Sequence, residues 1–248
     1  MTKAYITDYF KNQDIERSIL GDCLQNELSN DIKVLLVWHE IIDRNLIDQL
    51  PELKGIIRYG VGYESIDLGY AKSKNIYVCN TPDYGTSEVS DTALSMVLNI
   101  ARGVTRYDYV AQKIPKNWQE NTIQQLRRSS EITLGVIGAG RIGSSLIKKA
   151  LAVGFKIVFY DPYLPPSKIN ELEKMGAKTI NSKKELLQIS DIISLNCPQN
   201  IETKGMVNKS FLAMMKRGAS LVNTARGGLI ENLSLIGDAL ISNRLSCV

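Results

Sequence analysis

Short apolar runs alternate with longer polar segments along most of this 248-residue chain. In the first third the apolar runs lie at residues 4–7, 34–38, 55–59 and 76–79. Segments such as residues 12–28 and 66–73 separate these runs and are compatible with helices. Alternating strand and helix signals are typical of a parallel sheet with helices on both faces. We therefore predict a doubly wound α/β domain over residues 1–82, ending at Asn80-Thr81-Pro82.

A second α/β domain is predicted over residues 83–248. It begins with a helix at about residues 87–102, whose apolar residues recur at helical spacing. Because other apolar residues fall on its remaining sides, we expect this helix to be buried nearly all round, between the two domains. Residues 105–131 are polar, and we expect them to form an irregular arm anchored by Trp118.

Strand and helix patterns alternate again from residue 133 onward. The predicted strands lie at residues 133–137, 157–160, 177–180, 191–196 and 220–223, and the predicted helices at 168–175, 183–188, 209–216 and 233–242. Residues 245–248 look like the opening of one more strand. We therefore expect two doubly wound parallel sheets, a flavodoxin-like one and a Rossmann one, with the second incomplete and the polypeptide truncated.

The most informative motif is a Gly-x-Gly-x-x-Gly turn between a predicted strand and a predicted helix. Its glycines, Gly138, Gly140 and Gly143, permit a tight turn, close approach of the backbone to a pyrophosphate and close packing of helix on strand. Asp161 ends the next predicted strand, where a carboxylate can accept both ribose hydroxyls. A glycine triplet alone is often only a turn, but this context predicts a dinucleotide site. Asp161 favours NAD over NADP because a carboxylate repels a 2′-phosphate.

Composition narrows the class of protein without changing this prediction. The 44% apolar and 23% charged residues are ordinary for a globular protein, and the net charge of +4 comes with no long basic run. We expect no nucleic-acid partner and no metal site, since the four cysteines lie far apart and form no C-x-x-C pair. The sequence has no signal-peptide pattern and no 18-residue apolar run, so we expect a cytoplasmic protein without a membrane partner.

Two further turns carry candidate chemistry. Arg226 lies in a glycine-rich turn after a predicted buried strand, where its planar guanidinium could bind a carboxylate or could simply face solvent. Gly60, Val61 and Gly62 follow another predicted strand, and their successive amides could form an anion-binding nest or only a tight turn. Position alone leaves both pairs of alternatives open.

Together these segments resemble the D-isomer-specific 2-hydroxyacid dehydrogenases, and within them most closely the C-terminal binding protein branch. The matching segments are RYGVGYESID (58–67), CNTPDYGTSEVSDTAL (79–94), LGVIGAGRIG (134–143), FYDPYLP (159–165) and LVNTARGGLI (221–230). The resemblance implies an oxidoreductase that transfers a hydride between NAD(H) and a small 2-keto or 2-hydroxy acid. It also implies a homodimer that pairs through the nucleotide domain and its arm at about residues 105–131.

The resemblance also implies roles for individual residues. Arg226 would bind the substrate carboxylate and polarise the C2 carbonyl, and Val61 and Gly62, beside Gly60, would donate amides to that carboxylate. Asp161 would hold the adenosine ribose. The remaining residues with an implied role in cofactor binding are Gly138, Ala139, Gly140, Arg141, Ile142 and Gly143 at the pyrophosphate, Cys197, Pro198 and Thr203 in an adenine and ribose loop, and Thr224 and Ala225 near the nicotinamide.

The chain departs from the family at the acid–base pair. The family's mechanism uses a histidine hydrogen-bonded to a glutamate, and the chain's one histidine, His39, does not match that position. We therefore expect the intact protein to be an NAD-dependent enzyme and this chain to be inactive. The alternative is an NAD(H)-binding sensor or corepressor-like module without turnover.

Overall fold

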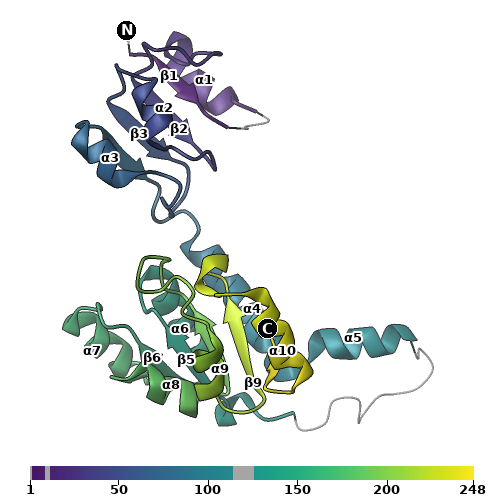
Figure 1. The fold of residues 1–248 in the computed structure, drawn as a ribbon. Coiled ribbons are helices and arrows are strands. Elements are labelled where there is room, and N and C mark those ends of the chain that lie inside the picture. Colours follow the sequence, from purple (N-terminus) through teal and green to yellow (C-terminus); the bar gives the residue numbers. More distant parts are fainter. Residues whose placement is uncertain (1, 9–11, 114–125) are drawn as a thin grey trace. The chain divides into compact units, whose positions relative to one another are not determined.

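The computed structural model describes residues 2–8, 12–113 and 126–248, and these fall into two compact units (Figure 1). The first unit is Met1–Tyr84 and the second is Gly85–Val248. Trp118, around which the sequence predicts an arm, lies outside the described residues. Each unit has its own parallel sheet.

The first unit has a four-stranded parallel sheet in the order β1-β2-β3-β4. Its strands are β1 (Ala4–Ile6), β2 (Val34–Val37), β3 (Gly55–Arg58) and β4 (Tyr77–Asn80). Its helices are α1 (Asp14–Leu20), the 3₁₀ turn η1 (Gly21–Cys23), α2 (Arg44–Asp48) and α3 (Leu68–Ser73). Fully buried side chains such as Leu35, Ile42 and Ile56 form its core. The predicted strands are thus found within one or two residues of their expected places.

The helix expected over residues 12–28 is shorter than the sequence predicts. It gives way to η1, and Leu24 then forms a parallel bridge with Ala4 at the free edge of β1. When Leu24 is counted as a one-residue strand, the spatial order of the sheet is 2-1-3-4-5, which is the flavodoxin-like order. Periodicity cannot reveal a strand of one residue, because it has no period.

The second unit has a six-stranded parallel sheet in the order β10-β9-β8-β5-β6-β7. Its strands are β5 (Thr133–Ile137), β6 (Lys156–Tyr160), β7 (Lys178–Thr179), β8 (Ile192–Leu195), β9 (Ala219–Asn223) and β10 (Leu245–Cys247). Numbered along the chain within this unit, the order is 3-2-1-4-5-6 read from β7, which is the Rossmann order. The strand that the sequence predicts to open at residue 245 is present as β10, where Leu245 pairs with Ala219 of β9.

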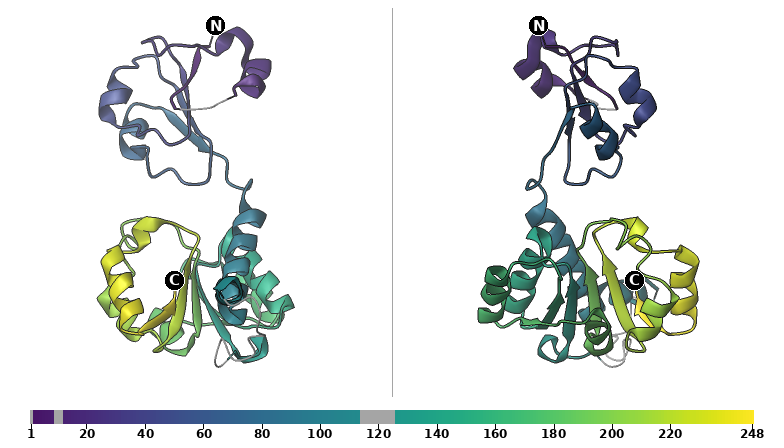
Figure 2. Two further views of the ribbon diagram at one scale, coloured as in Figure 1. Left: turned by 90° about the vertical axis from the view of Figure 1, so that its right-hand side faces the viewer. Right: turned by 60° about the vertical axis from the view of Figure 1, so that its left-hand side comes forward.

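Helices cover both faces of this sheet (Figure 2). One core cluster joins the sheet to α4 (Thr86–Arg102), α6 (Arg141–Ala152) and α7 (Pro166–Lys174). The other joins it to α8 (Lys183–Ile189), α9 (Lys209–Met214) and α10 (Leu233–Ile241). Two further elements are the 3₁₀ turns η2 (Ser129–Glu131) and η3 (Gly227–Leu229). Among the described residues, no helix is both long enough and apolar enough to cross a membrane.

Helix α4 is buried on one side only, whereas the sequence predicts burial nearly all round. Its buried residues are Ser90, Ala93, Val97 and Ala101, a single stripe at helical spacing, whereas Met96 is 45% exposed. The buried stripe faces α6, where the buried Ser90 hydroxyl lies 2.9 Å from that of Ser145. Apolar residues outside the stripe misled the prediction, because composition alone does not assign a face.

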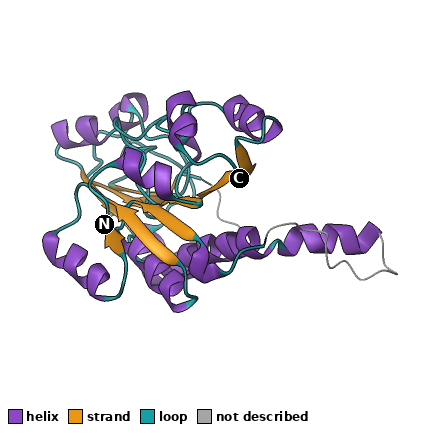
Figure 3. Cartoon of the chain, turned by 90° about the horizontal axis from the view of Figure 1, so that it is seen from below, coloured by secondary structure: helices purple, strands orange, loops and turns teal. Residues whose placement is uncertain are grey.

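The predicted irregular arm also begins differently. Residues Val104–Lys113 form a helix, α5, with no buried residue, after Gly103 has ended α4 in the left-handed conformation. Figure 3 shows α5 extending away from the sheet of its own unit. The sequence did not reveal this helix, because most of its residues are polar. Its few apolar residues, such as the exposed Val104 and Tyr109, form no continuous periodic stripe.

Candidate functional site

The turn between β5 and α6 is built so that glycine is required at two of its positions. Gly138 has a φ of +88°, and its amide donates to the carbonyl of Tyr160 at 2.9 Å. A Cβ on Gly138 would lie 2.7 Å from the amide nitrogen of Cys197, and one on Gly143 would lie 2.0 Å from the carbonyl oxygen of Gly138. The turn therefore packs tightly against α6 and against the chain that leaves β8.

Gly140 differs from its two neighbours in the motif. A Cβ placed on it would meet nothing within 4 Å, and its φ of −64° is open to any residue. Gly140 is therefore not needed for the fold of the turn. The open space at its α-carbon is what a backbone needs in order to approach a phosphate closely.

Helix α6 begins directly at this open position. Its N-cap is Gly140, which has no side chain that could cap the first turn of the helix. The Ser144 hydroxyl is turned back to the carbonyl of Ala139 at 2.6 Å. The backbone amides of a helix N-terminus and the positive end of the helix dipole favour a bound anion, so the turn fits a pyrophosphate.

Asp161 follows β6 and is tied to the same turn. Its Oδ2 accepts from the amide of Ala139 at 2.8 Å, and its Oδ1 accepts from the amide of Tyr163 at 3.0 Å. An ionised carboxylate has about four acceptor positions, so each oxygen can accept one more hydrogen bond. Asp161 is thus held in place with the capacity to accept a pair of hydroxyls.

The loop after β8 is fixed by its own side chains. The Asn200 side-chain oxygen accepts from the amides of Glu202 and Thr203, and the Thr203 hydroxyl donates to the carbonyl of Pro198 at 2.6 Å. The Thr203 hydroxyl therefore shapes this loop. Burial raises the pKa of the Cys197 thiol, and the charge of Asp161 raises it further, so Cys197 is a neutral residue beside that carboxylate.

Arg226 lies in a turn after β9 that Asn223 holds closed. The Asn223 side chain donates to the carbonyl of Arg226 at 2.8 Å and accepts from the amide of Ala225 at 3.1 Å. One guanidinium nitrogen of Arg226 donates to the carbonyl of Ala225 at 2.8 Å. Sequence reasoning missed Asn223, although a polar residue at the end of an apolar run was a usable signal.

Two buried polar atoms in these loops have no hydrogen-bond partner in the part of the chain that the structure describes. They are the hydroxyl oxygen of Thr224, after β9, and the side-chain oxygen of Asn196, after β8. Buried polar atoms are nearly always paired in folded proteins, so such atoms point to a polar ligand or water. Together with the open α-carbon of Gly140, they fit a cofactor that carries phosphate, hydroxyl and amide groups.

These loops all lie at the carboxyl ends of strands of one parallel sheet. They follow β5, β6, β8 and β9, four strands that are neighbours in the order β9-β8-β5-β6. The chain reverses direction across the sheet between β5 and β8, the position where parallel α/β sheets bind ligands beyond the carboxyl ends of their strands. The structure therefore brings together the residues of this unit that the sequence singles out.

In the first unit, the anion-binding nest predicted at residues 60–62 uses only some of its amides within the turn itself. Gly60 has a φ of +153°, and its amide donates to the carbonyl of Arg58, so it is already used. Within the described residues, the amides of Val61 and Gly62 donate to no backbone carbonyl. The Asn80 side chain donates to the carbonyl of Val61 at 2.8 Å. The turn is thus held by its carbonyls, and two of the three predicted amides can serve a ligand.

Residue 60 is glycine because its φ of +153° is a conformation that other residues rarely adopt, and the side chain of Arg58 fills the space beside it. A Cβ on Gly60 would lie 1.3 Å from a guanidinium nitrogen of Arg58, which donates to the carbonyl of Tyr59 at 2.7 Å. The guanidinium carbon also lies 5.5 Å from the centre of the Trp38 ring. Sequence reasoning did not identify Arg58, because its contacts depend on the fold.

His39 lies in the loop after β2, beside Trp38. Its ring meets the Trp38 ring edge-on, with centroids 4.9 Å apart. The Asp8 carboxylate accepts from the backbone amides of Trp38, His39 and Glu40. Burial raises the pKa of Asp8, but these hydrogen bonds outweigh it and hold the pKa below its usual value. The contacts of His39 therefore shape a loop.

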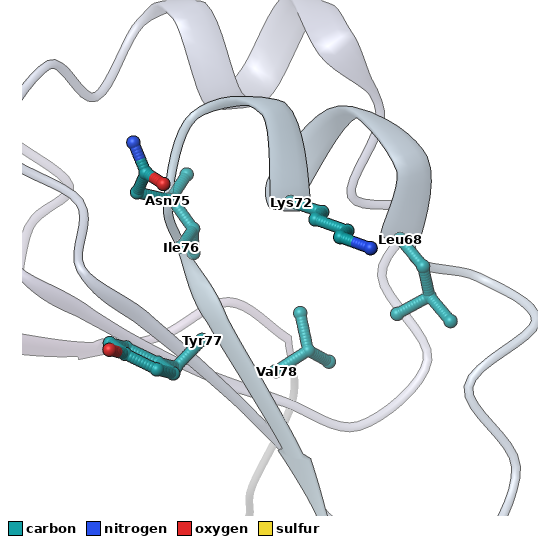
Figure 4. A pocket seen from close by; sticks show the side chains of 6 residues that line it. All are labelled: Leu68, Lys72, Asn75, Ile76, Tyr77 and Val78. Carbon is teal, nitrogen blue, oxygen red and sulfur yellow. The ribbon is translucent and has the colours of Figure 1, made fainter.

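A separate hollow of about 330 Å³ lies between α3 and β4 in the first unit (Figure 4). Its lining residues are Leu68, Lys72, Asn75, Ile76, Tyr77 and Val78. Tyr77 and Val78 begin β4, so the hollow lies at the opposite end of this strand from Asn80. It carries one cationic side chain and none of the loops described above, and we assign it no role.

Comparison with known proteins agrees with this geometry. Residues 94–248 match the family model described as D-isomer specific 2-hydroxyacid dehydrogenase, NAD binding domain. D-3-phosphoglycerate dehydrogenase of Methanocaldococcus jannaschii is 34% identical over 194 residues, covering 78% of this chain and 36% of that protein. Glyoxylate reductase of Thermococcus litoralis is 34% identical over 221 residues, covering 87% of this chain and 65% of that protein.

A solved structure resembles the chain over nearly its whole length. It is D-lactate dehydrogenase from Aquifex aeolicus, complexed with NAD and lactic acid, with a TM-score of 0.88 and 28% sequence identity. The match covers 99% of this chain and 75% of that one. The chain thus spans about one to two thirds of the length of the two curated relatives and three quarters of this structure.

Proposed function

Because the chain belongs to the D-isomer-specific 2-hydroxyacid dehydrogenase family, we propose that its second unit binds NAD(H) in the turn between β5 and α6. We further propose that the protein serves hydride transfer between NAD(H) and a small 2-keto or 2-hydroxy acid. The observation that carries the proposal is the joined construction of the turn and Asp161: the amide of Ala139 donates to the carboxylate at 2.8 Å, beside an open Gly140.

Each residue of the second unit has a distinct task in this proposal. The amides at the start of α6 hold the pyrophosphate, and Asp161 accepts the two hydroxyls of the adenosine ribose. The unpaired oxygens of Thr224 and Asn196 supply further polar contacts. Bound NADH supplies the hydride, and the protein supplies orientation and charge.

Substrate binding is assigned to two groups of donors. The guanidinium of Arg226 binds the carboxylate of the acid and polarises its C2 carbonyl, because its planar fork matches two oxygens at once. In the first unit, the amides of Val61 and Gly62 are the second group of donors that we assign to a carboxylate. Gly60, whose amide is already bound to Arg58, keeps the backbone in the conformation that presents the next two amides.

The chain's own residues also suggest a second candidate, an NAD(H)-binding module without turnover. The observation that favours it is the setting of His39, whose ring packs on Trp38 and whose loop is held by Asp8. No general acid is assigned in this chain, and we therefore propose that the 248 residues by themselves turn over slowly or not at all.

Turnover and binding together separate the two candidates. The full chain is titrated with NADH by calorimetry, and NADH oxidation is then followed with glyoxylate, pyruvate and hydroxypyruvate. Binding without NADH oxidation supports the module, whereas NADH oxidation coupled to reduction of any of these keto acids supports the dehydrogenase. Absence of NADH binding would contradict both.

We also propose that the protein forms a homodimer through its second unit. The support is α5, which has no buried residue and exposes Val104 and Tyr109 at 60% and 58%. A helix with exposed apolar positions gains from a partner surface. Sedimentation of the wild type and of a Val104→Ser/Tyr109→Ser double variant tests this proposal, with the wild type expected as a dimer and the variant shifted toward monomer. A monomeric wild type would contradict it.

A further inference from the structure

One tyrosine connects two carboxylates at the adenosine end of the cofactor turn. The amide of Tyr163 donates to Asp161 at 3.0 Å, and its hydroxyl donates to the carboxylate of Glu202. Asp161 follows β6 and Glu202 follows β8, so the two acids come from loops 41 residues apart that the tyrosine ties together. Both side chains of the hydrogen-bonded pair are exposed, and hence accessible to a ligand.

Glu202 is held in position from its own side as well. The Asn200 side-chain oxygen accepts from the Glu202 amide at 2.9 Å and from the Thr203 amide at 3.0 Å. The Thr203 hydroxyl closes the same turn on the carbonyl of Pro198. The backbone of Glu202 is thus fixed, and the Tyr163 hydroxyl orients its carboxylate toward the loop of Asp161.

The electrostatics of Tyr163 agree with this placement. The hydrogen bond to Glu202 raises the pKa of the Tyr163 phenol, and the Asp161 carboxylate raises it further. A phenol that both carboxylates influence marks a region of negative potential. The basic residue nearest to Glu202 along the chain is Lys204, two residues later in the same loop.

We propose that Glu202, oriented by Tyr163, is a second specificity-determining carboxylate, which acts with Asp161 to exclude cofactors carrying a phosphate on the adenosine ribose. The inference rests on the proposed NAD(H) site. A 2′-phosphate brings close to two negative charges to a position already beside Asp161, and a second fixed carboxylate adds its own repulsion. At an exposed site this repulsion changes affinity on the order of five- to tenfold, and salt screens it.

The test measures NADH and NADPH affinities of the full chain by fluorescence titration. Glu202→Gln removes the charge and keeps the shape, Tyr163→Phe removes only the tether, and Glu131→Gln is the matched control, since Glu131 lies at the opposite end of β5. We expect Glu202→Gln to lower the preference for NADH over NADPH about five- to tenfold at low salt. Tyr163→Phe should lower it by less, and Glu131→Gln should leave it unchanged.

The outcomes are distinct. A fall in the preference that disappears at high salt supports the inference, because a purely structural effect of Glu202 would not follow ionic strength. An unchanged preference in Glu202→Gln, with NADH bound normally by the wild type, would overturn the inference alone. If the wild type bound neither cofactor, the proposed function would fail and the inference with it.

Discussion

The amide of Ala139 donates to the carboxylate of Asp161 at 2.8 Å, joining the end of β5 to the end of β6. This contact unites the two parts of the motif that the sequence could place only by spacing. It means that the acid expected to bind the ribose also holds the turn expected to bind the pyrophosphate. Loss of that carboxylate should therefore affect both.

Replacing Asp161 with Asn tests this double role. The variant loses the charge and one acceptor oxygen, so either the Ala139 or the Tyr163 amide loses its partner. We expect NADH affinity to fall by about tenfold or more, corresponding to about 1.4 kcal/mol. Calorimetric titration measures the loss, and equal affinity in wild type and variant would contradict the assignment.

The crowding at Gly143 predicts an effect on stability. Alanine is normally better than glycine inside a helix by about 1 kcal/mol, but here its Cβ would lie 2.0 Å from the carbonyl oxygen of Gly138. We expect Gly143→Ala to lower the free energy of unfolding by about 1–3 kcal/mol. Gly237→Ala, within α10 and with nothing within 4 Å, is the control and should stabilise the protein. Urea unfolding followed by circular dichroism compares the two, and the same sign for both would refute this reading.

Asp191 predicts a pH dependence of stability. Burial raises its pKa, but hydrogen bonds from the Thr133 amide at 2.8 Å and from Lys216 at 3.0 Å, with Arg127, hold the pKa below its usual value. Its contribution is therefore present above about pH 4, the pKa range of the unfolded chain, and is lost as the pH falls through the lower folded pKa.

The variant Asp191→Asn measures this contribution. We expect it to lower the free energy of unfolding by about 1–2 kcal/mol at neutral pH, with the difference from wild type shrinking in strong acid. Asp238→Asn, an exposed change on α10, serves as the control. A deficit in Asp191→Asn that is as large at low pH as at neutral pH would show that the charge is not its cause.

The role assigned to Arg226 predicts that lysine at this position binds a carboxylate more weakly than arginine does. Lysine keeps the positive charge but offers a point charge in place of a planar fork. We expect Arg226→Lys to weaken binding of oxamate, a 2-keto acid analogue, to the NADH-loaded protein by about tenfold. NADH binding itself should change less. Arg217→Lys, before the opposite end of β9, is the control, and an equal effect of both variants would remove the assigned role.

Much of the fold was predictable from the sequence because its strands are short apolar runs between helices. The glycine turn was equally predictable, since the motif's glycines serve a tight turn and close helix packing, and the crowding at Gly138 and Gly143 has that cause. The strand formed by Leu24 and the helix of Val104–Lys113 were not, because one has no period and the other has few apolar positions.

The missed site residues share a different physical cause. Asn223 holds the turn of Arg226, Arg58 crosses Gly60, and Tyr163 reaches Glu202, all through side-chain contacts that depend on how loops meet. Such contacts have no periodic signature, and the last pair is separated by 39 residues. Sequence patterns therefore located the loops that form the site, while their mutual support became visible only in the structure.

The most direct test of the account is NADH binding by the full chain with Gly140 and with Gly140→Ala. A Cβ at this position meets nothing within 4 Å and its φ of −64° suits alanine, so the fold should be unchanged. We predict that thermal unfolding without cofactor stays the same while NADH affinity falls by about tenfold or more, because the methyl group occupies the space the pyrophosphate needs. Equal NADH affinity in the two proteins would contradict the account.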